Sequence, residues 1–189
     1  MRWDEQGARS GQRHVVVPRT LIFITHGCEV LLLRGAPTKR LWPGKMNGIG
    51  GHIERHEDVY ASARREVAEE TGLDVEPLTL RGILHVTHPE RDPGVMLMVF
   101  TGEALSKEVR ASAEGDLLWC PLEALPEAEM VQDLPLLLPR LFAPGAEGRL
   151  IYGHYSVDED GEMTFHFFNP PSALDDVGSL PMDRTQCGR

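Results

Sequence analysis

Apolar residues occur along the chain in short runs that glycine, proline and acidic residues separate. Runs of this length, rich in Val, Leu, Ile and aromatic residues, predict β-strands. Seven runs fit the pattern: residues 15–25, 29–34, 78–86, 95–101, 119–122, 150–157 and 162–168. Gly27 predicts a tight turn between the first two, and Asp-Glu-Asp-Gly predicts a hairpin between the last two. Both faces of residues 95–101 are apolar, which predicts a central strand.

Two further segments have helical character. Between Asp58 and Gly72 the chain is rich in Ala, Glu and Arg, which favour helix. Asp58 is a candidate N-cap, and Gly72 suits the position just past a helix end. Asp133 is a candidate cap for a leucine-rich segment that ends at Phe142, where Pro139 predicts a kink or a late start. This succession of strands and helices predicts a mixed sheet between helices.

Three glutamates share one side of the first predicted helix. At about 100° per residue, Glu66 and Glu70 stack one above the other and Glu69 lies beside them. Like charges at this spacing destabilise an isolated helix by roughly 0.2–0.5 kcal/mol per pair, which a bound cation offsets. Carboxylate oxygens are hard ligands that suit Mg²⁺ or Mn²⁺. The alternative is a solvated acidic face beside Arg64 and Arg65.

The loop before this helix, GKMNGIGG at residues 44–51, favours the metal hypothesis. Its glycines let the backbone come close to a ligand and adopt positive φ. The loop lacks the Lys-Ser/Thr pair of a Walker loop and the GxGxxG spacing of a dinucleotide site. Loop and helix together therefore predict a metal-dependent site of another kind.

Composition limits the class of protein. The chain has 189 residues, of which 41% are hydrophobic, which is about one domain's worth. Its net charge of −10 argues against binding a nucleic-acid polymer, but it allows a small nucleotide whose phosphates are screened by divalent cations. Three isolated cysteines show neither zinc spacing nor a disulfide framework, and we find no signal-peptide pattern or membrane-length apolar stretch. We expect a cytoplasmic protein without a membrane partner.

Residues 51–73 read GHIERHEDVYASARREVAEETGL and match the Nudix box at every specified position. These positions are Gly51, Glu57, Arg65, Glu66, Val67, Glu69, Glu70, Gly72 and Leu73. The sequence thus resembles a MutT-type Nudix hydrolase. The resemblance implies an α/β fold, the Nudix α/β/α sandwich with a mixed β-sheet. We expect the Nudix hydrolase domain at residues 15–168, between a flexible N-terminal arm (1–14) and a C-terminal tail (169–189).

The resemblance also implies which residues form the site, with Mg²⁺ (or Mn²⁺) as cofactor. It gives four metal ligands: the carbonyl of Gly50 and the carboxylates of Glu66, Glu69 and Glu70. Its supporting ion pair falls on Glu57 and Arg65, which would brace the loop against the helix. Glu69 or Glu114 would take the proton of the attacking water. For Glu114, a plain surface loop is the alternative.

Substrate contacts follow from a narrower similarity. Residues 47–53, NGIGGHI, are similar to the stretch found in family members that hydrolyse oxidised purine nucleoside triphosphates. This makes Asn47 the candidate base reader, and a weaker parallel adds Asp133. Trp42 is the candidate for stacking on the base, and Lys45 is a candidate phosphate contact. The structural alternatives are a turn residue for Asn47, a helix cap for Asp133 and a solvated basic loop for Lys45.

The function that the resemblance implies is Mg²⁺-dependent hydrolysis of a nucleoside triphosphate to a nucleoside monophosphate and pyrophosphate. An oxidised purine substrate such as 8-oxo-dGTP is the more specific hypothesis. Two alternatives stay open: hydrolysis of ADP-ribose or another nucleoside diphosphate derivative, and a catalytically inactive domain that senses a nucleotide. Retention of all the box carboxylates argues against the last. Homodimers are common among the resembling proteins, although the sequence identifies no interface.

Overall fold

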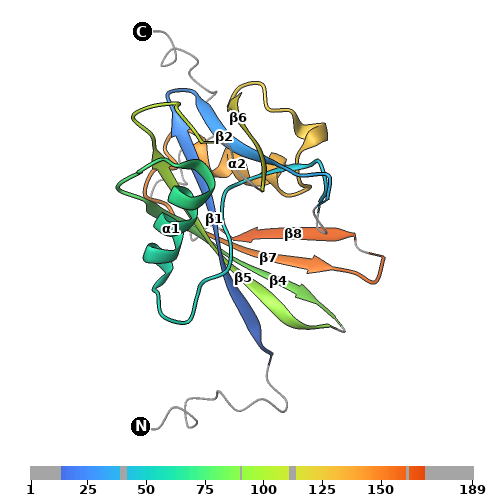
Figure 1. The fold of residues 1–189 in the computed structure, drawn as a ribbon. Helices are drawn as coiled ribbons and strands as arrows, with labels where there is room; N and C mark the ends of the chain where they lie inside the picture. Colours follow the sequence, from blue (N-terminus) through green and yellow to red (C-terminus); the bar gives the residue numbers. More distant parts are fainter. Residues whose placement is uncertain (1–13, 39–41, 90, 111–113, 161, 169–189) are drawn as a thin grey trace.

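The computed structural model describes residues 14–38, 42–89, 91–110, 114–160 and 162–168. These ranges contain one mixed β-sheet and two α-helices, α1 (Val59–Thr71) and α2 (Leu134–Phe142) (Figure 1). The strands are β1 (Val16–His26), β2 (Glu29–Gly35), β3 (Met46–Asn47), β4 (Thr79–His88), β5 (Arg91–Glu103), β6 (Gly115–Pro121), β7 (Ile151–Val157) and β8 (Met163–Phe168). A short 3₁₀ helix, η2 (Glu127–Glu129), precedes α2.

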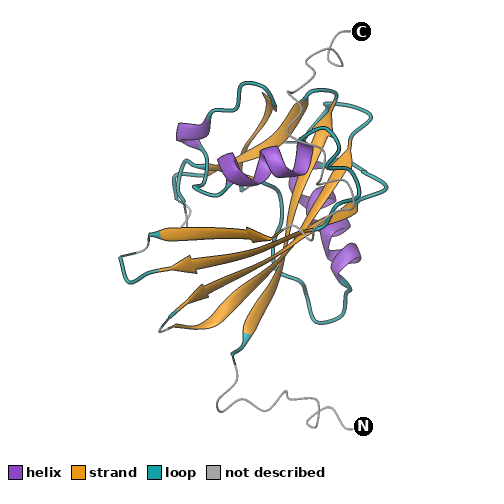
Figure 2. Ribbon diagram, turned by 180° about the vertical axis from the view of Figure 1, so that it is seen from behind, coloured by secondary structure: helices purple, strands orange, loops and turns teal. Residues whose placement is uncertain are grey.

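The sheet has the strand order β3-β2-β1-β5-β4-β7-β8, and β6 also pairs with β2. The β1–β5 and β4–β7 pairs are parallel, whereas the other pairs are antiparallel. The two views of the ribbon show a curled sheet with α1 on one side and α2 on the other (Figures 1 and 2). This arrangement confirms the predicted α/β fold with a mixed sheet between helices.

Strand β1 separates two hydrophobic cores, because successive side chains of a strand point to opposite faces. Ile22 and Ile24 lie in the core that includes Ala63 and Val67 of α1. Leu21, Phe23 and four leucines of α2 lie in the other core. We call these two sides of the sheet the α1 face and the α2 face. Even-numbered residues of β1 thus serve the α1 face, and odd-numbered residues serve the α2 face.

Both ends of helix α1 lie where the sequence predicts them. The Asp58 carboxylate accepts hydrogen bonds from the backbone N–H groups of Tyr60 (2.8 Å) and Ala61 (2.9 Å). Gly72 adopts a left-handed conformation with φ 73°, and its N–H donates to the Ala68 carbonyl. Both predicted caps are therefore confirmed.

Several predicted boundaries are wrong. Strand β6 begins at Gly115, four residues before the predicted start, because residues 115–121 pair continuously with β2. The two-residue strand β3 was not predicted. Helix α2 begins at Leu134 and runs through Pro139, so the prediction of a late start is wrong. The Pro139 carbonyl still accepts the closing hydrogen bond from the Ala143 N–H.

The predicted N-terminal arm and C-terminal tail lie almost wholly outside the part of the chain that the structure describes. The predicted tail, residues 169–189, and all of the predicted arm except His14 lie outside the described residues. Cys120 is buried and its thiol is free. No helix in the described ranges has the length and apolar character needed to cross a membrane.

We predict that Asp58→Ala destabilises the protein by about 1 kcal/mol, because two N–H groups of the first turn of α1 lose their acceptor. Urea unfolding followed by circular dichroism measures this loss. The matched control is Asp74→Ala, which removes a carboxylate that is 89% exposed and has only a long ion pair with Arg64. A control loss as large as that of Asp58→Ala would contradict the capping role.

Candidate active site

A glycine segment, residues 48–51, lies against the N-terminal half of β1 and continues the sheet there. The Ile22 N–H donates to the Ile49 carbonyl (2.7 Å), and the Ile49 N–H donates to the Ile22 carbonyl (3.0 Å). Farther along, the Thr20 N–H donates to the Gly51 carbonyl (2.9 Å). These bonds fix the segment to the sheet just before the chain turns into α1.

Two glycines of the segment allow contacts that no other residue would permit. Gly50 has φ 142°, and a Cβ atom there would lie 2.3 Å from the Thr20 carbonyl oxygen. A Cβ atom on Gly51 would lie 2.3 Å from Oε1 of Glu66. The Glu66 carboxylate is therefore pressed against the backbone of the segment, with 9% of the residue exposed.

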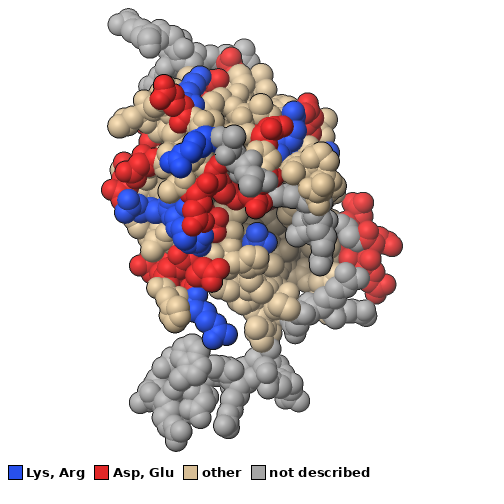
Figure 3. Space-filling view, viewed as in Figure 1, with Lys and Arg blue, Asp and Glu red and all other residues tan. Residues whose placement is uncertain are grey.

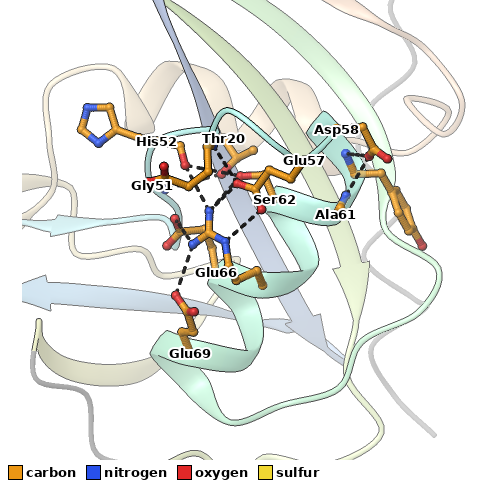
Figure 4. A network of polar contacts seen from close by, with 12 residues as sticks. Thr20, Gly51, His52, Glu57, Asp58, Ala61, Ser62, Glu66 and Glu69 are labelled. Atoms are coloured by element: carbon orange, nitrogen blue, oxygen red, sulfur yellow. Dashed lines mark hydrogen bonds and ion pairs between the residues drawn. The ribbon is translucent and has the colours of Figure 1, made fainter.

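Arg65 joins the loop to α1. Its Nε and Nη2 atoms donate to the two oxygens of Glu57, at 3.0 and 2.6 Å. Nη2 also donates to the His52 carbonyl (3.1 Å), and Nη1 donates to Glu66 (2.9 Å). Figure 4 shows these bonds converging on one guanidinium between loop and helix. The predicted contact between Glu57 and Arg65 is present as a bidentate ion pair.

The ion pair fixes the charge of both partners. Hydrogen bonding to Arg65 lowers the pKa of Glu57 from 4.5 to about 2. The same bond is the main cause of a raised pKa for Arg65. Both groups thus stay ionised across the neutral pH range, and the Glu57–Arg65 ion pair persists there.

The three helix glutamates lie at different depths. Glu66 is buried, Oε2 of Glu70 accepts from the Gly50 N–H (3.3 Å), and the side chain of Glu69 is 62% exposed. Arg65 Nη1 also donates to Glu69 (3.2 Å) and so holds it beside Glu66. In this arrangement, no three His, Cys, Asp or Glu side chains of the described residues converge on one metal position.

The donor set nevertheless fits a hard divalent cation. The Ile49 and Gly51 carbonyls accept bonds from β1, whereas no donor among the described residues bonds to the Gly50 carbonyl. A carboxylate oxygen of Glu66 lies against Gly51, and one of Glu70 accepts a bond from the Gly50 N–H. Carboxylate and carbonyl oxygens are the ligands that Mg²⁺ and Mn²⁺ prefer.

The surface around α1 carries charge of both signs. Figure 3 shows acidic side chains gathered there, with basic groups among them, beside a hollow whose walls are mostly uncharged. Such a hollow next to a carboxylate cluster suits a ligand with a charged end and an uncharged end.

A second group of polar residues lies on the α2 face. Asp133 occupies the N-cap position of α2, but its side chain makes no capping bond and the residue is 6% exposed. Burial raises the pKa of its carboxyl group. The buried Tyr155 hydroxyl interacts with this carboxyl, although no hydrogen bond of ordinary geometry forms. Asn47 is half-buried, and its Oδ1 accepts from the Gly48 N–H (2.8 Å).

The remaining candidates lie in exposed segments. Trp42 is 46% exposed and has φ 49°. The Lys45 ammonium donates to the Ala128 carbonyl (2.8 Å), which links the loop to η2. Glu114 precedes β6, and its carbonyl accepts from the Ala36 N–H (3.0 Å). The roles of these three residues stay predictions.

Three residues of the site were missed by sequence reasoning. Thr20 bonds the Gly51 N–H through its hydroxyl (3.4 Å), and Ser62 lies between Arg65 (3.3 Å) and the His52 carbonyl (3.5 Å). Tyr155 lies beside Asp133 from a strand 22 positions away. For Ser62, the spacing of three before Arg65 on one helix face was an available signal. Thr20 and Tyr155 come from distant strands and gave none.

Comparisons with known proteins agree on one family. A family model described as NUDIX domain matches residues 16–141. The oxidized purine nucleoside triphosphate hydrolase of Danio rerio is 28% identical over 125 residues, which are 64% of this chain and 79% of that protein. The NAD-capped RNA hydrolase NudC of Pseudomonas aeruginosa is 32% identical over 111 residues, 58% of this chain and 37% of that protein. The chain thus spans little more than a third of the second relative.

A solved structure supports the fold. The MutT protein from Bacillus halodurans has a TM-score of 0.67 with this chain at 24% identity, and the match covers 80% of this chain and 97% of that one. At this level of identity the likeness shows the fold alone.

The lowered pKa of Glu57 predicts a pH-dependent stability. A carboxyl whose pKa falls from 4.5 to about 2 on folding stabilises the protein above pH 4.5, and this contribution is lost as pH falls toward 2. We therefore expect wild type to exceed Glu57→Gln in free energy of unfolding at pH 5–7, with a gap that narrows between pH 4.5 and 2. Urea unfolding of both proteins at each pH, in buffer that contains a chelator, measures this difference in free energy of unfolding.

The control for this measurement is Glu123→Gln, at an exposed residue in the turn after β6. Its difference from wild type should not change over the same pH range. A gap between wild type and Glu57→Gln that stays constant from pH 7 to 3 would contradict the ion-pair explanation.

Proposed function

The chain belongs to the NUDIX domain family, and from this premise we propose that it hydrolyses a nucleoside triphosphate to a nucleoside monophosphate and pyrophosphate with Mg²⁺ or Mn²⁺ as cofactor. Membership makes it a pyrophosphohydrolase acting on nucleotide phosphoanhydrides, in a family that generally uses divalent metal cations. The observation that carries the proposal is the contact of the Glu66 and Glu70 carboxylates with the glycine segment.

In the proposed site, Glu66, Glu70 and the Gly50 carbonyl would hold the cation, and Glu69 would complete the set of ligands. The cation supplies charge neutralisation on the phosphates and Lewis-acid activation of the attacking water. The chain's own contribution is position. Arg65 holds Glu66 and Glu69 side by side, and its bidentate bond to Glu57 prevents the loop from moving relative to α1.

The proton of the attacking water requires a base near the phosphate. Glu69 is the candidate that the geometry favours, because its carboxylate is mostly exposed and lies one turn from Glu66 on the same ridge. Glu114 is the second candidate, from the loop before β6.

Recognition of the base is proposed on the α2 face. Asp133 and the Tyr155 hydroxyl are buried polar groups without a well-formed mutual bond, and a buried polar group of this kind gains stability from a ligand that pairs with it. Asn47 in β3 directly precedes the glycine segment, and the carbonyl of the preceding Met46 accepts a bond from the Val131 N–H (3.0 Å), two residues before Asp133. Trp42 would cover the base by stacking. The name of the Danio rerio relative supports an oxidised purine nucleotide as substrate.

A second candidate function is hydrolysis of ADP-ribose or another nucleoside diphosphate derivative. The Pseudomonas aeruginosa relative, named for NAD-capped RNA, supports it over the part of that protein that the chain matches. A catalytically inactive nucleotide sensor is less well supported, since all the box carboxylates are present. A homodimer and a cytoplasmic location stay predictions.

We predict that Glu70→Gln lowers kcat by at least about 100-fold, because even residues that only support a metal ligand change activity by 10–100-fold. The fold should persist, since an amide oxygen still accepts from the Gly50 N–H. Steady-state hydrolysis with Mg²⁺, together with thermal unfolding, measures both effects. Glu162→Gln, at an exposed residue beside β8, is the control and should match wild type. Full Mg²⁺-dependent activity of Glu70→Gln would refute the ligand assignment.

A substrate panel separates the candidate functions. We expect 8-oxo-dGTP to be hydrolysed faster than dGTP, to a monophosphate and pyrophosphate, with Mg²⁺ and not with chelator. Product identification by ion-exchange chromatography distinguishes pyrophosphate from successive release of phosphate. Faster hydrolysis of ADP-ribose would favour the second candidate. Binding of nucleotides without turnover of any would favour the sensor.

A further inference from the structure

Arg19 is a half-buried arginine whose side chain has no partner among the described residues. It lies on β1 opposite Leu97 of β5 and points to the α2 face, like Leu21. Other arginines of the described chain donate to carboxylates or carbonyls: Arg34, Arg64, Arg65, Arg81 and Arg140. Partial burial removes some of the hydration of this guanidinium, so an anion that binds to Arg19 would restore favourable interactions that the side chain lacks.

The backbone places Arg19 directly beside the end of the glycine segment. Arg19 and His52 form an antiparallel β-bridge, flanked by the bond from the Thr20 N–H to the Gly51 carbonyl (2.9 Å). On the other side, the Ile53 N–H donates to the Pro18 carbonyl (3.2 Å). Directly opposite residues of a bridge point to the same face of a sheet. The exposed His52 imidazole, which has no hydrogen bond or ion pair with a described residue, therefore points to the same face of the sheet as the Arg19 side chain.

The carboxylates approach the same segment from the opposite side. Glu66 contacts Gly51 at the α1 face, and His52 is the next residue. Gly51 and His52 are adjacent residues, so the Arg19–His52 pair and the proposed cation site lie on opposite faces of the same short segment. A polyphosphate bound at the carboxylates thus has a cationic group within reach on the other side.

Charge favours a phosphate at this position. The chain carries a net charge of −10, and three box glutamates, Glu66, Glu69 and Glu70, lie at the proposed cation site, so one bound cation leaves negative charges on a triphosphate uncompensated. A guanidinium presents a planar fork of N–H donors that matches phosphate oxygens in pairs. Arg19 supplies this fork without giving up an existing ion pair.

We propose that Arg19, with His52 beside it, binds a phosphate group of the substrate on the α2 face of the glycine segment. The inference rests on the proposed function for the identity of the nucleotide, but binding of the phosphate itself does not require turnover. Arg19 is then a specificity residue for the phosphate chain, and Asn47 and Asp133 remain the candidates for the base.

The test is calorimetric binding of inorganic pyrophosphate with Mg²⁺ to wild type, Arg19→Ala and Arg19→Lys. We expect Arg19→Ala to weaken binding at least about tenfold, as loss of a charge-assisted hydrogen bond does. Arg19→Lys should bind with intermediate affinity, because it keeps the charge without the fork. Arg64→Ala is the matched control, since Arg64 pairs with Asp74 and Glu76 away from the segment, and its affinity should equal that of wild type.

A kinetic measurement accompanies the binding assay. For any nucleotide that wild type hydrolyses, Arg19→Ala should raise KM more than it lowers kcat. Thermal unfolding of each variant reports folding, and Arg19→Lys keeps the test decisive if Arg19→Ala fails to fold.

The outcomes distinguish the inference from the proposed function. Pyrophosphate affinity of Arg19→Ala equal to wild type overturns the inference, whatever the turnover. The inference is also overturned if wild type does not bind pyrophosphate. It is overturned as well if Arg19→Ala loses affinity only for the unphosphorylated nucleoside. Wild type that binds pyrophosphate through Arg19 but hydrolyses no nucleotide supports the inference and overturns the proposed function.

Discussion

The close approach of the Glu66 carboxylate to the backbone at Gly51 is the constraint on which the site depends. No side-chain atom fits between them, because a Cβ atom on Gly51 would lie 2.3 Å from Oε1. The approach requires that β1 hold the glycine segment and that α1 stay in register with it. Arg65 meets the second requirement through its bonds to Glu57, Glu66 and the His52 carbonyl. The geometry is therefore set by the protein before any ligand arrives.

The glycine segment also divides the site by chemistry. On the α1 face are carboxylates, which suit a hard cation. On the α2 face are an arginine, a histidine and the buried Asp133 and Tyr155. A nucleotide has the same division, with a polyphosphate at one end and a base with hydrogen-bonding edges at the other. In the proposed function, cation binding and base recognition therefore lie on opposite faces of one sheet and need no separate domains.

Local spacing explains what the sequence could predict. The caps at Asp58 and Gly72, the ridge of glutamates and the Glu57–Arg65 pair all lie within sixteen residues of chain, where helix geometry fixes neighbours. The burial of Asp133 could not be predicted, because it depends on Tyr155 of β7 and on leucines of α2 that meet only in the folded sheet. The start of β6 likewise depends on pairing with β2 and not on its own composition. The position of Arg19 beside His52 likewise depends on a bridge between segments 33 residues apart in the chain.

The alternation of β1 has a further consequence for how this strand can change in evolution. Each of its two sets of side chains is committed to a different neighbourhood, one beneath α1 and the other beneath α2. Insertion or deletion of a single residue between Arg19 and Leu21 would turn Arg19 to the α1 face. There its guanidinium would compete with a cation for the carboxylates of Glu66 and Glu70. Length variation in this protein should therefore gather in the connecting loops, and the stretch from Pro18 to Ile24 should tolerate replacement of residues but not a change in their number.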